Sequence, residues 1–505
     1  MRPKVIDPKP GFPLLFEIGR PGRSAVSLPV GEESGSDPGA FLPADTLRDE
    51  APMLAEVGEL DLVRHYVRLS QRNLGVDTAF YPLGSCTMKY NPRVHEKAAA
   101  LPGFAGVHPW QPESSIQGFL ALFRDLERRL AAITGMDAVS LQPAAGAHGE
   151  MAGLLVIRAC LRERGEGRRR VVLIPDSAHG TNPATCTLCG LKAVQVRSTP
   201  HGAIDVEDLR AKLSPDVAAV MVTNPNTLGL FEADIAGVAG RVHEAGGLVY
   251  MDGANLNAIL GRARPGDFGV DVMHLNVHKT FSTPHGGGGP GAGPIAVKAA
   301  LEPFLPVPRI VERNGRLAWD WVRPASVGKV KSFWGNAGVL LRAYAYIAGL
   351  GDEGLRRVSL HAVLNANYLR ARLKGAYALP YDRPCLHEFV LSAVRQKKHG
   401  VRALDIAKRL LDYGFHAPTI YFPLIVPEAL MIEPTETESR ETLDRFAEAM
   451  LAIAREAEET PDLLLQAPHT TPVRRLDEVR AAKTPVLTCC GGIPPAVEPV
   501  APDGG

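Results

Sequence analysis

One lysine lies in a setting that surface exposure does not explain, in the stretch HLNVHKTFSTPHGGGGPGAGP at residues 274–294. Lys279 follows an apolar run, lies next to His278, and is separated by six residues from four consecutive glycines. A solvated lysine needs neither the neighbouring histidines nor the glycines. We therefore interpret Lys279 as an amine that is held in place for chemistry.

Other small or polar residues stand where short, apolar, β-branched runs end. In an open α/β sheet, ligands collect at the carboxyl ends of the strands, so these residues are candidates for one shared site. They are Ala145, Gly146 and Ala147 after the run 138–142, His179 after 171–175, Thr223 at the end of 217–223, Asp252 and Asn255 at and just after the end of 247–252, and His278 and Lys279 after 272–277.

This set of groups suits pyridoxal phosphate (PLP). The aldehyde of PLP needs a lysine amine, its ring nitrogen needs a carboxylate, and its ring needs a planar neighbour. Lys279, Asp252 and His179 offer these three groups. The small-residue turn 145–147 opens a predicted helix, and a helix N-terminus favours a phosphate anion.

Nucleotide cofactors fit less well. The chain has no Walker A signature (G-x-x-x-x-G-K-[ST]), and its polyglycine follows Lys279 instead of preceding it. A Rossmann site needs G-x-G-x-x-G directly after a first strand, and GGGGPG does not stand there.

The elements that must position these groups are strands alternating with helices. Continuous apolar strands in this alternation indicate a mostly parallel sheet covered on both faces, in an α/β fold. The predicted strands are 138–142, 171–175, 193–197, 217–223, 247–252, 272–277 and 294–298, with helical patterns at 150–165 and 235–247.

From about residue 336 the pattern changes to long helices, followed by two or three strands and another helix, which predicts a smaller α+β lobe. The helices are expected at 336–350, 355–373 and 438–458, and the strands around 387–394 and 419–426. We predict an N-terminal arm and helical segment at 1–75, a large PLP-binding domain at 76–335, a small C-terminal domain at 336–470 and a tail at 471–505.

The ends of the chain read differently from its middle. Residues 20–52 are rich in Gly, Ser and Pro, which predicts an extended arm that wraps a neighbouring subunit. The tail after Pro472 is also Pro-rich, and we expect disorder over residues 491–505.

Composition excludes several classes of protein. Of 505 residues, 56 are Lys or Arg and 55 are Asp or Glu, so the net charge of +1 draws the chain neither to nucleic acid nor to a membrane. The N-terminus carries no signal-peptide pattern, and no window approaches a membrane span, so we expect a soluble, cytoplasmic protein. Cys186 and Cys189 form a C-x-x-C, but zinc needs a second suitable pair, so we predict buried thiols and no metal site.

Several long motifs closely resemble those of glycine decarboxylase, the P-protein of the glycine cleavage system. They are VHKTFSTPHGGGGPGAGPI around Lys279, YPLGSCTMKYNP (81–92), LQPAAGAHGEMAGLL (141–155), SAHGTNPA (177–184), DGANLNA (252–258), RPGDFGVDV (264–272), YGFHAPTIYFPL (413–424) and EPTETES (433–439). The resemblance covers residues 60–480. In length the chain looks like subunit 2 of the split form of this family, which carries the PLP lysine.

The resemblance implies a fold and roles for the candidate residues. The fold would be that of fold type I PLP enzymes, which is like aspartate aminotransferase. Lys279 would bind the cofactor covalently, with His278 near the phosphate, His179 stacked on the ring and glycines 286–289 in a mobile loop at the rim. The long form of the family commonly has a hydroxyl residue where this chain has Ala145, so a side-chain phosphate contact at that position is in doubt.

Other residues carry weaker expectations. Tyr81, Ser85, Cys86 and Thr87 are candidates for the glycine pocket, although a turn satisfied around Gly84 explains them too. Thr223 and Asn255 equally fit plain capping of a strand end and a turn. His416 and Glu433 belong to motifs that, by resemblance, shape the substrate entrance.

The function implied by the resemblance is PLP-dependent decarboxylation of glycine, with release of carbon dioxide. The aminomethyl group would pass to the lipoyl arm of a carrier, the H-protein. The partners implied are a homologous subunit 1, in a heterotetramer of two pairs, and the lipoylated H-protein. Two alternatives stay open here: another fold type I PLP enzyme, such as an aminotransferase or lyase, and a non-catalytic subunit that stabilises a partner.

Overall fold

The computed structural model describes residues 13–27, 37–49, 54–286 and 291–485. The chain divides into two compact units. One is formed by residues 75–467, and the other by residues 1–74 together with 468–505. The expectations for glycines 287–289, for the tail end 491–505 and for parts of the arm fall outside the described residues.

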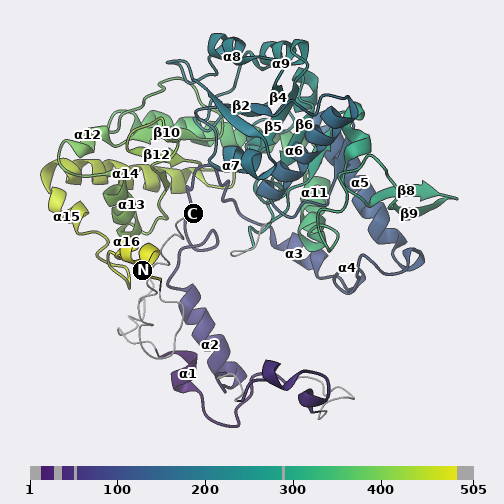
Figure 1. The fold of residues 1–505 in the computed structure, drawn as a ribbon. Coiled ribbons are helices and arrows are strands. Elements are labelled where there is room, and N and C mark those ends of the chain that lie inside the picture. Colours follow the sequence, from purple (N-terminus) through teal and green to yellow (C-terminus); the bar gives the residue numbers. More distant parts are fainter. Residues whose placement is uncertain (1–12, 28–36, 50–53, 287–290, 486–505) are drawn as a thin grey trace, which may run out of the picture. The chain divides into compact units, whose positions relative to one another are not determined.

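A seven-stranded sheet forms the centre of the 75–467 unit (Figure 1). Its strands are β1 (Ala138–Ser140), β2 (Val171–Pro175), β3 (Lys192–Val196), β4 (Val217–Thr223), β5 (Leu248–Gly253), β6 (Val272–Leu275) and β7 (Ile295–Val297). The order is β1-β7-β6-β5-β4-β2-β3. The pairs from β6 to β3 are parallel, and β7 is antiparallel to both its neighbours. The predicted mostly parallel sheet is therefore present.

Helices cover both faces of this sheet. The helices of the large lobe are α3 (Arg93–Ala99), α4 (Pro102–Ala105), α5 (Gln117–Thr134), α6 (Gly146–Glu163), α7 (Thr181–Leu188), α8 (Val206–Lys212), α9 (Ile235–Glu244) and α10 (Val277–Thr280). In β5, Val249 and Met251 pack in one cluster with side chains of α5 and α9, whereas Leu248 and Tyr250 pack in another with those of α6 and α7. Burial on both faces explains the continuous apolar run of this strand.

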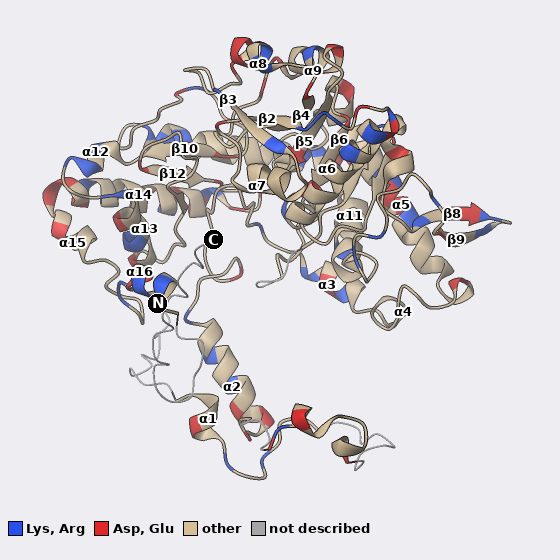
Figure 2. Cartoon of the chain, in the orientation of Figure 1, with Lys and Arg blue, Asp and Glu red and all other residues tan. Residues whose placement is uncertain are grey.

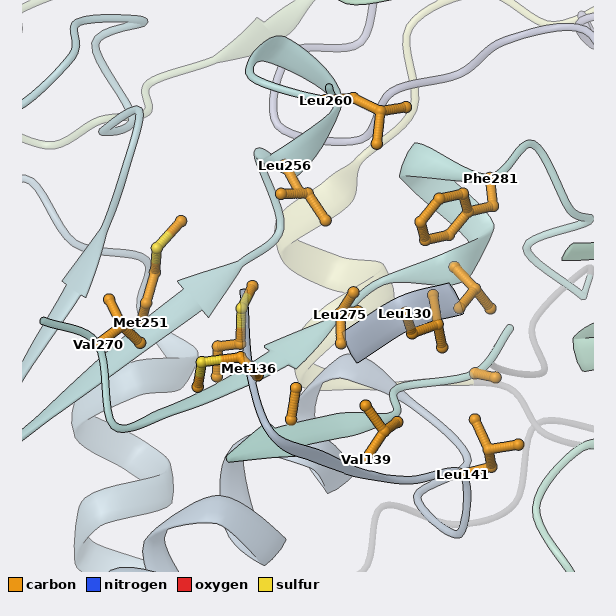
Figure 3. Close-up of a cluster of buried hydrophobic side chains, with 14 of the residues drawn as sticks. Leu130, Met136, Val139, Leu141, Met251, Leu256, Leu260, Val270, Leu275 and Phe281 are labelled. Carbon is orange, nitrogen blue, oxygen red and sulfur yellow. The ribbon is translucent and has the colours of Figure 1, made fainter. Parts of the chain in front are cut away.

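The first of these clusters lies under the segments that carry the site. Figure 3 shows Met251 of β5, Leu256 of the turn after it, Leu275 of β6 and Phe281 just after α10. None of these four side chains has measurable solvent exposure. Packing of this density fixes the backbone on both sides of Asp252 and Lys279.

Strand β6 ends two residues earlier than predicted, so His278 and Lys279 lie in the short helix α10. Pairing with β7 stops because the next residue on that strand is Pro294, which has no N–H to donate. The N–H groups of Lys279 and Thr280 instead donate to the carbonyl oxygen of Asn276, at 2.9 and 3.1 Å. Lys279 thus projects from a helical turn that follows the strand, and Asp252 is followed by one further strand residue, Gly253.

The small lobe contains a three-stranded antiparallel sheet in the order β10-β12-β11. Its strands are β10 (Phe389–Ser392), β11 (Thr419–Ile420) and β12 (Ala429–Ile432), and its helices are α12 (Val394–Lys397), α13 (Ala403–Asp412), α14 (Arg440–Glu459) and α15 (Pro461–Leu465). Sequence analysis anticipated β10, β11 and α14 but not β12, the central strand. It also missed the hairpin of β8 (Arg309–Arg313) and β9 (Arg316–Asp320).

Helix α11 (Ala337–Leu373) links the cores of the two lobes. Its first part, including Leu340 and Tyr346, packs in the large-lobe cluster, and its last part, including Leu369 and Leu373, packs in the small-lobe cluster. The helix is interrupted at Gly351, whose φ of +59° is left-handed. This break falls between the two helices predicted from the sequence; the domain boundary at 335/336 stays a prediction.

The other unit is described by itself. Its helices are α1 (Leu15–Ile18), α2 (Glu59–Ser70) and α16 (Glu478–Lys483). No residue of α2 is buried, and Leu60, Val63 and Tyr66 are exposed by more than half. The described parts of the predicted arm hold only short 3-10 turns, at 38–40 and 44–46.

Charged side chains of both signs are interspersed along the outer helices, as Figure 2 shows for α8, α9 and α14. This mixture matches the near-zero net charge. No helix in the described residues combines the length and the apolar character that crossing a membrane requires.

Candidate active site

A cavity with an empty volume of about 680 Å³ opens at the carboxyl edge of the large sheet. Most residues that the sequence singled out line it: Ser85, Gly146, Ala147, His179, Thr223, Asp252, Asn255, His278 and Lys279. Ala145, Tyr81, Cys86 and Thr87 are not among the lining residues. The cavity therefore brings together the predicted amine, carboxylate, imidazole and small-residue turn.

Lys279 is half-buried, and its amine is held at the cavity wall. Its Nζ donates to the carbonyl oxygen of Ser85 at 2.8 Å. Ser85 belongs to a turn 194 positions away in the chain, so a tertiary contact holds the amine.

Asp252 contributes a buried carboxylate to the cavity, and this carboxylate has three partners. Its Oδ1 lies 3.1 Å from Nε2 of His274 and accepts the N–H of Ala254 at 2.9 Å, and its Oδ2 accepts from the amide of Asn182 at 3.1 Å. Burial alone would raise the pKa of Asp252, but His274 and Lys279 outweigh it and hold that pKa well below its ordinary value. Asp252 is therefore an ionised carboxylate across the neutral pH range.

His274 holds this charge in place from the neighbouring strand. Asp252 and His274 are register partners on β5 and β6, and Nδ1 of His274 lies 2.8 Å from the hydroxyl of Tyr250. Burial disfavours an imidazolium, but the facing carboxylates of Asp252 and Glu150 raise the pKa of His274 above its ordinary value. The raised pKa favours the charged form of His274, which in turn stabilises the Asp252 carboxylate.

His179 lies between β2 and α7, is exposed and lines the cavity. Its Nδ1 lies 3.0 Å from the hydroxyl of Thr181, which in turn donates to Glu150 at 3.0 Å. The ring also meets Phe422 edge-on, with centroids 5.4 Å apart. These contacts orient an imidazole at the cavity wall.

The opposite end of the cavity is built for an anion. Helix α6 begins at Gly146, and the N–H groups of a first helical turn have no partner within the helix. A Cβ at Gly146 would approach the Asn276 amide to 2.5 Å, and one at Gly293 would collide with the carbonyl oxygen of Ala145, so both positions require glycine. Ala145 contributes only backbone atoms here, because its methyl side chain cannot donate a hydrogen bond to a phosphate.

His278 adds a neutral imidazole to this end. Burial, His285 and Lys279 lower the pKa of His278 to about 3, and burial and Lys279 lower that of His285 to about 4. At neutral pH these rings donate through one nitrogen without adding charge.

Three buried polar atoms of cavity residues have no hydrogen-bond partner within the described chain. They are Oγ1 of Thr223, Oδ1 of Asn255 and Oδ1 of Asn276. Buried polar groups are nearly always satisfied, so these atoms await a polar ligand. A phosphate end, a carboxylate for a cationic ring nitrogen, an amine and orphaned polar atoms together fit PLP.

The turn 84–87 forms the wall facing Lys279. Ser85 and Thr87 have φ values of +65° and +49°, in the left-handed region that non-glycine residues avoid. Thr87 is buried and binds Glu433 through its N–H at 2.9 Å and its hydroxyl at 2.5 Å. Glu433 is thus fully buried behind this turn, and the expectation that it shapes an entrance is wrong.

Tyr81 and His416 meet away from the cavity lining. Their rings stack with centroids 3.6 Å apart and an angle of 15° between planes. This contact joins two of the motifs singled out in the sequence, YPLGSCTMKYNP and YGFHAPTIYFPL.

Sequence reasoning missed several buried charges around the site. Lys89 is the clearest: its Nζ contacts the carboxylate of Glu436 at 2.7 Å, the amide oxygen of Asn257 at 2.9 Å and the carbonyl oxygen of Thr280 at 2.9 Å. This one ammonium joins the 81–92 motif, the residue after Lys279 and the 433–439 motif. The sequence signal that could have identified Lys89 was its position inside the 81–92 motif. The other buried charges that were not predicted are His274, Glu150, Glu388 and Glu436.

The thiols are buried as expected. Burial raises the pKa of Cys186 to about 12, and Sγ of Cys189 faces the carbonyl oxygen of Met151 at 3.8 Å. Among the described residues, the two groups of side chains close enough to hold a metal are Glu150-Asp252-His274 and His387-Glu388-Glu433, and neither contains a cysteine. Cys489 and Cys490 lie outside the described residues.

Two protein-family models match different regions of the chain. The model of "Glycine cleavage system P-protein" matches residues 40–316, more than half of the chain, and that of "Glycine dehydrogenase, C-terminal domain" matches residues 358–470. This chain belongs to the glycine cleavage system P-protein family. The family predicted from the motifs is confirmed.

Curated members of the P-protein family match over nearly their whole length. The chain is 57% identical to probable glycine dehydrogenase (decarboxylating) subunit 2 of Caldanaerobacter subterraneus subsp. tengcongensis, covering 94% of this chain and 98% of that protein. It is 60% identical to the protein of the same name in Exiguobacterium sibiricum, covering 94% and 96%.

Solved structures confirm the fold class. An inhibitor-bound glycine decarboxylase (P-protein) of the glycine cleavage system superposes with a TM-score of 0.70 at 24% identity, over 82% of this chain and 94% of that one. A sphingosine-1-phosphate lyase of Burkholderia pseudomallei superposes with a TM-score of 0.61 at 15% identity, over 85% and 99%. The fold is that of fold type I PLP enzymes, and the P-protein family identifies PLP as the cofactor.

Proposed function

We propose that this P-protein family member decarboxylates glycine at the cavity of Lys279, with PLP as its cofactor. The observation that carries the proposal is the convergence of one amine, one buried carboxylate and one helix N-terminus on a single cavity. The family favours glycine decarboxylation over an aminotransferase or lyase of the same fold.

When bound, PLP supplies an aldehyde that links to amines and a pyridinium ring that accepts the electron pair left by departing carbon dioxide. Lys279 provides the amine for that link, and the Ser85 carbonyl oxygen orients it toward the cavity. Glycine enters as the competing amine.

Asp252 holds the proton on the ring nitrogen, because a fixed carboxylate beside a cation raises the pKa of that cation. His274 keeps Asp252 ionised from behind, at 3.1 Å. His179 lines the same cavity and would pack against the cofactor ring. Its orientation is supported by the bonds that Thr181 and Glu150 make beneath it.

The start of α6, at Gly146 and Ala147, would hold the phosphate together with His278. Thr223, Asn255 and Asn276 satisfy their orphaned oxygens on the cofactor or on bound glycine. Ser85 is the member of the predicted glycine pocket that lines the cavity, and Tyr81, Cys86 and Thr87 do not line it.

The aminomethyl group passes to the lipoyl arm of an H-protein, and the chain works with a homologous subunit 1 in a heterotetramer of two pairs. Relatives carry the name "subunit 2", and helix α2 exposes Leu60, Val63 and Tyr66, which an assembled enzyme would cover. The cytoplasmic location stays a prediction.

The test is exchange of labelled carbon dioxide into glycine by the purified chain, with and without subunit 1 and lipoylated H-protein, alongside native mass measurement. We expect exchange that requires both proteins, and a mass of two pairs. Exchange at the full rate by the lone chain would contradict the split-enzyme assembly, and a lack of exchange under every condition would contradict the activity.

A further inference from the structure

Two buried glutamates, Glu388 and Glu433, have no part in the chemistry described above. Glu388 directly precedes β10 and Glu433 directly follows β12. The register of these antiparallel strands pairs Phe389 with Ile432, so the two glutamates come next to each other across the end of the ladder. Both are fully buried, and the strand ends aim them at the large lobe.

Both carboxyl groups hold the turn that faces Lys279. Oε2 of Glu388 accepts the N–H of Ser85 at 2.7 Å, and Glu433 accepts the N–H and the hydroxyl of Thr87 at 2.9 and 2.5 Å. Ser85 and Thr87 are the two residues of this turn with left-handed backbone. A backbone conformation of this kind persists only where the surroundings impose it.

The turn transmits this support to the amine. The carbonyl of the residue that Glu388 holds, Ser85, accepts the hydrogen bond from Lys279 at 2.8 Å. Glu388 also lies 3.4 Å from the amide nitrogen of Asn255, a residue of the opposite cavity wall. Neither carboxyl group lines the cavity itself. Glu388 contacts two residues that do, Ser85 and Asn255.

The surroundings of the pair favour a bound proton. Burial and the neighbouring Glu433 raise the pKa of Glu388 well above its ordinary value, and burial raises that of Glu433 to about 7. The other titratable groups that face the pair are Lys279 on α10, Cys86 in the turn, His387 on the same strand end, whose pKa burial lowers to about 3, and Glu436, which Lys89 pairs. Nε2 of His387 lies 3.8 and 3.9 Å from the carboxyl groups of Glu388 and Glu433, and the positive charge of Lys279 acts on both of them.

We propose that Glu388 and Glu433 are a proton-holding carboxyl pair that positions the Lys279 amine through the turn 84–87. The pair consists of positioning residues, and the proposal rests on the role given above to Lys279. With both acids protonated, the pair satisfies the turn without a buried negative charge. Ionisation of Glu433 places a negative charge in this fully buried pair, which costs folding free energy, although its oxygens still accept from Thr87.

The proposal fixes the direction in which folding stability changes with pH. An unfolded glutamate titrates near 4.5 and folded Glu433 near 7, so the folded chain binds this proton more tightly. The stabilisation is complete below pH 4.5 and is lost as the pH rises toward 7. Glutamine mimics the protonated acid: its oxygen accepts the Thr87 N–H, and its amide donates to the Thr87 hydroxyl.

The experiment compares Glu433→Gln and Glu433→Ala, and the same pair of changes at Glu388, with wild type. The first readout is the melting temperature of the PLP-free chain from pH 5 to 8. We expect Glu433→Gln to lose less stability over that range than wild type. The second readout is PLP affinity by absorbance titration. Glu433→Ala should bind about tenfold more weakly, because the Thr87 N–H and hydroxyl both lose their acceptor and the turn is no longer held, and Glu433→Gln should restore most of the affinity.

Glu127→Gln is the matched control. Glu127 is a mostly buried glutamate, whose pKa burial raises to about 7, but it faces Arg309 at 3.8 Å and does not line the cavity. Its variant should flatten the pH dependence of melting and leave PLP affinity unchanged. The proposal is overturned if the alanine variants at Glu388 and Glu433 bind PLP like wild type, or if Glu433→Gln melts with the wild-type pH dependence. Failure of wild type itself to bind PLP would instead contradict the proposed function.

Discussion

The two walls of the cavity were unequally visible in the sequence. The large-lobe wall consists of groups at strand ends, such as Asp252 and Lys279, and strand ends can be found by reading apolar runs. The small-lobe wall lies behind the cavity lining and consists of buried charges: Glu388 and Glu433 bind the turn 84–87, and Glu436 binds Lys89, each from more than 300 residues away. A regular sheet brings the first set together, whereas tertiary contacts alone bring the second together.

The two sets of residues also have different roles. The large-lobe wall supplies the groups that meet the cofactor, and the small-lobe wall holds them in position. Changes in the first should abolish chemistry in a chain that still folds, and changes in the second should weaken folding or positioning first.

The largest effect is expected from Lys279→Ala. The variant should fold like wild type, because the amine makes one hydrogen bond in the described structure. It should lose the absorbance band of lysine-bound PLP after dialysis, and exchange of carbon dioxide into glycine should fall below detection. Near-normal exchange would show that the amine comes from another residue.

Lys89→Met tests the buried charges of the small-lobe wall, because Lys89 pairs with Glu436. The change leaves Glu436 as an unpaired carboxylate that is almost completely buried, and breaking a buried ion pair costs ~3–5 kcal/mol. We expect the free energy of unfolding, from urea titration of the PLP-free chain, to fall by that amount. A double change with Glu436→Gln should recover part of the loss. A loss below ~1 kcal/mol, the size for an exposed pair, would contradict the central position given to Lys89.

Asp252→Asn returns to the large-lobe wall with a smaller change. An amide cannot stabilise a cationic ring nitrogen, so the rate of exchange should fall by ~10²-fold or more, the scale for loss of one fixed electrostatic partner. PLP affinity should change far less, because the phosphate end is untouched. A rate within about threefold of wild type, or ~0.7 kcal/mol, would exclude this role for Asp252.

The smallest effect is expected from Thr223→Val, which removes a hydroxyl that has no partner in the described chain. PLP affinity should fall about fivefold, the worth of one ordinary hydrogen bond of ~1 kcal/mol. The melting temperature of the PLP-free chain should stay equal or rise, since an unsatisfied buried group disappears. Equal affinity in both proteins would favour the strand-capping interpretation of Thr223 that the sequence left open.

Much of the fold could be predicted because buried parallel strands such as β4 and β5 read as continuous apolar runs bounded by polar turns. Strand β12 was missed because its four residues, Ala429–Ile432, lie between a turn and a motif and carry no alternation. The hairpin of β8 and β9 was missed because its residues RIVER and RLAWD are rich in charge.

Within the site, the roles of His274 and Lys89 could not be predicted. His274 reads as one residue of an apolar strand, and only its register opposite Asp252 reveals its charge partner. Lys89 reads as an ordinary lysine between Met88 and Tyr90, and only burial by four separate segments distinguishes it. The motifs drew attention to the right segments, but long-range contacts determine what each residue does.

The central claim is that Lys279 is the lysine that binds PLP. Borohydride reduction of the PLP-loaded chain fixes the cofactor to its lysine, and peptide mass mapping then locates the added mass. We predict a single modified site at Lys279, in a chain where Lys89 also approaches this region. Labelling of Lys89 or any other lysine, with Lys279 unmodified, would contradict the account.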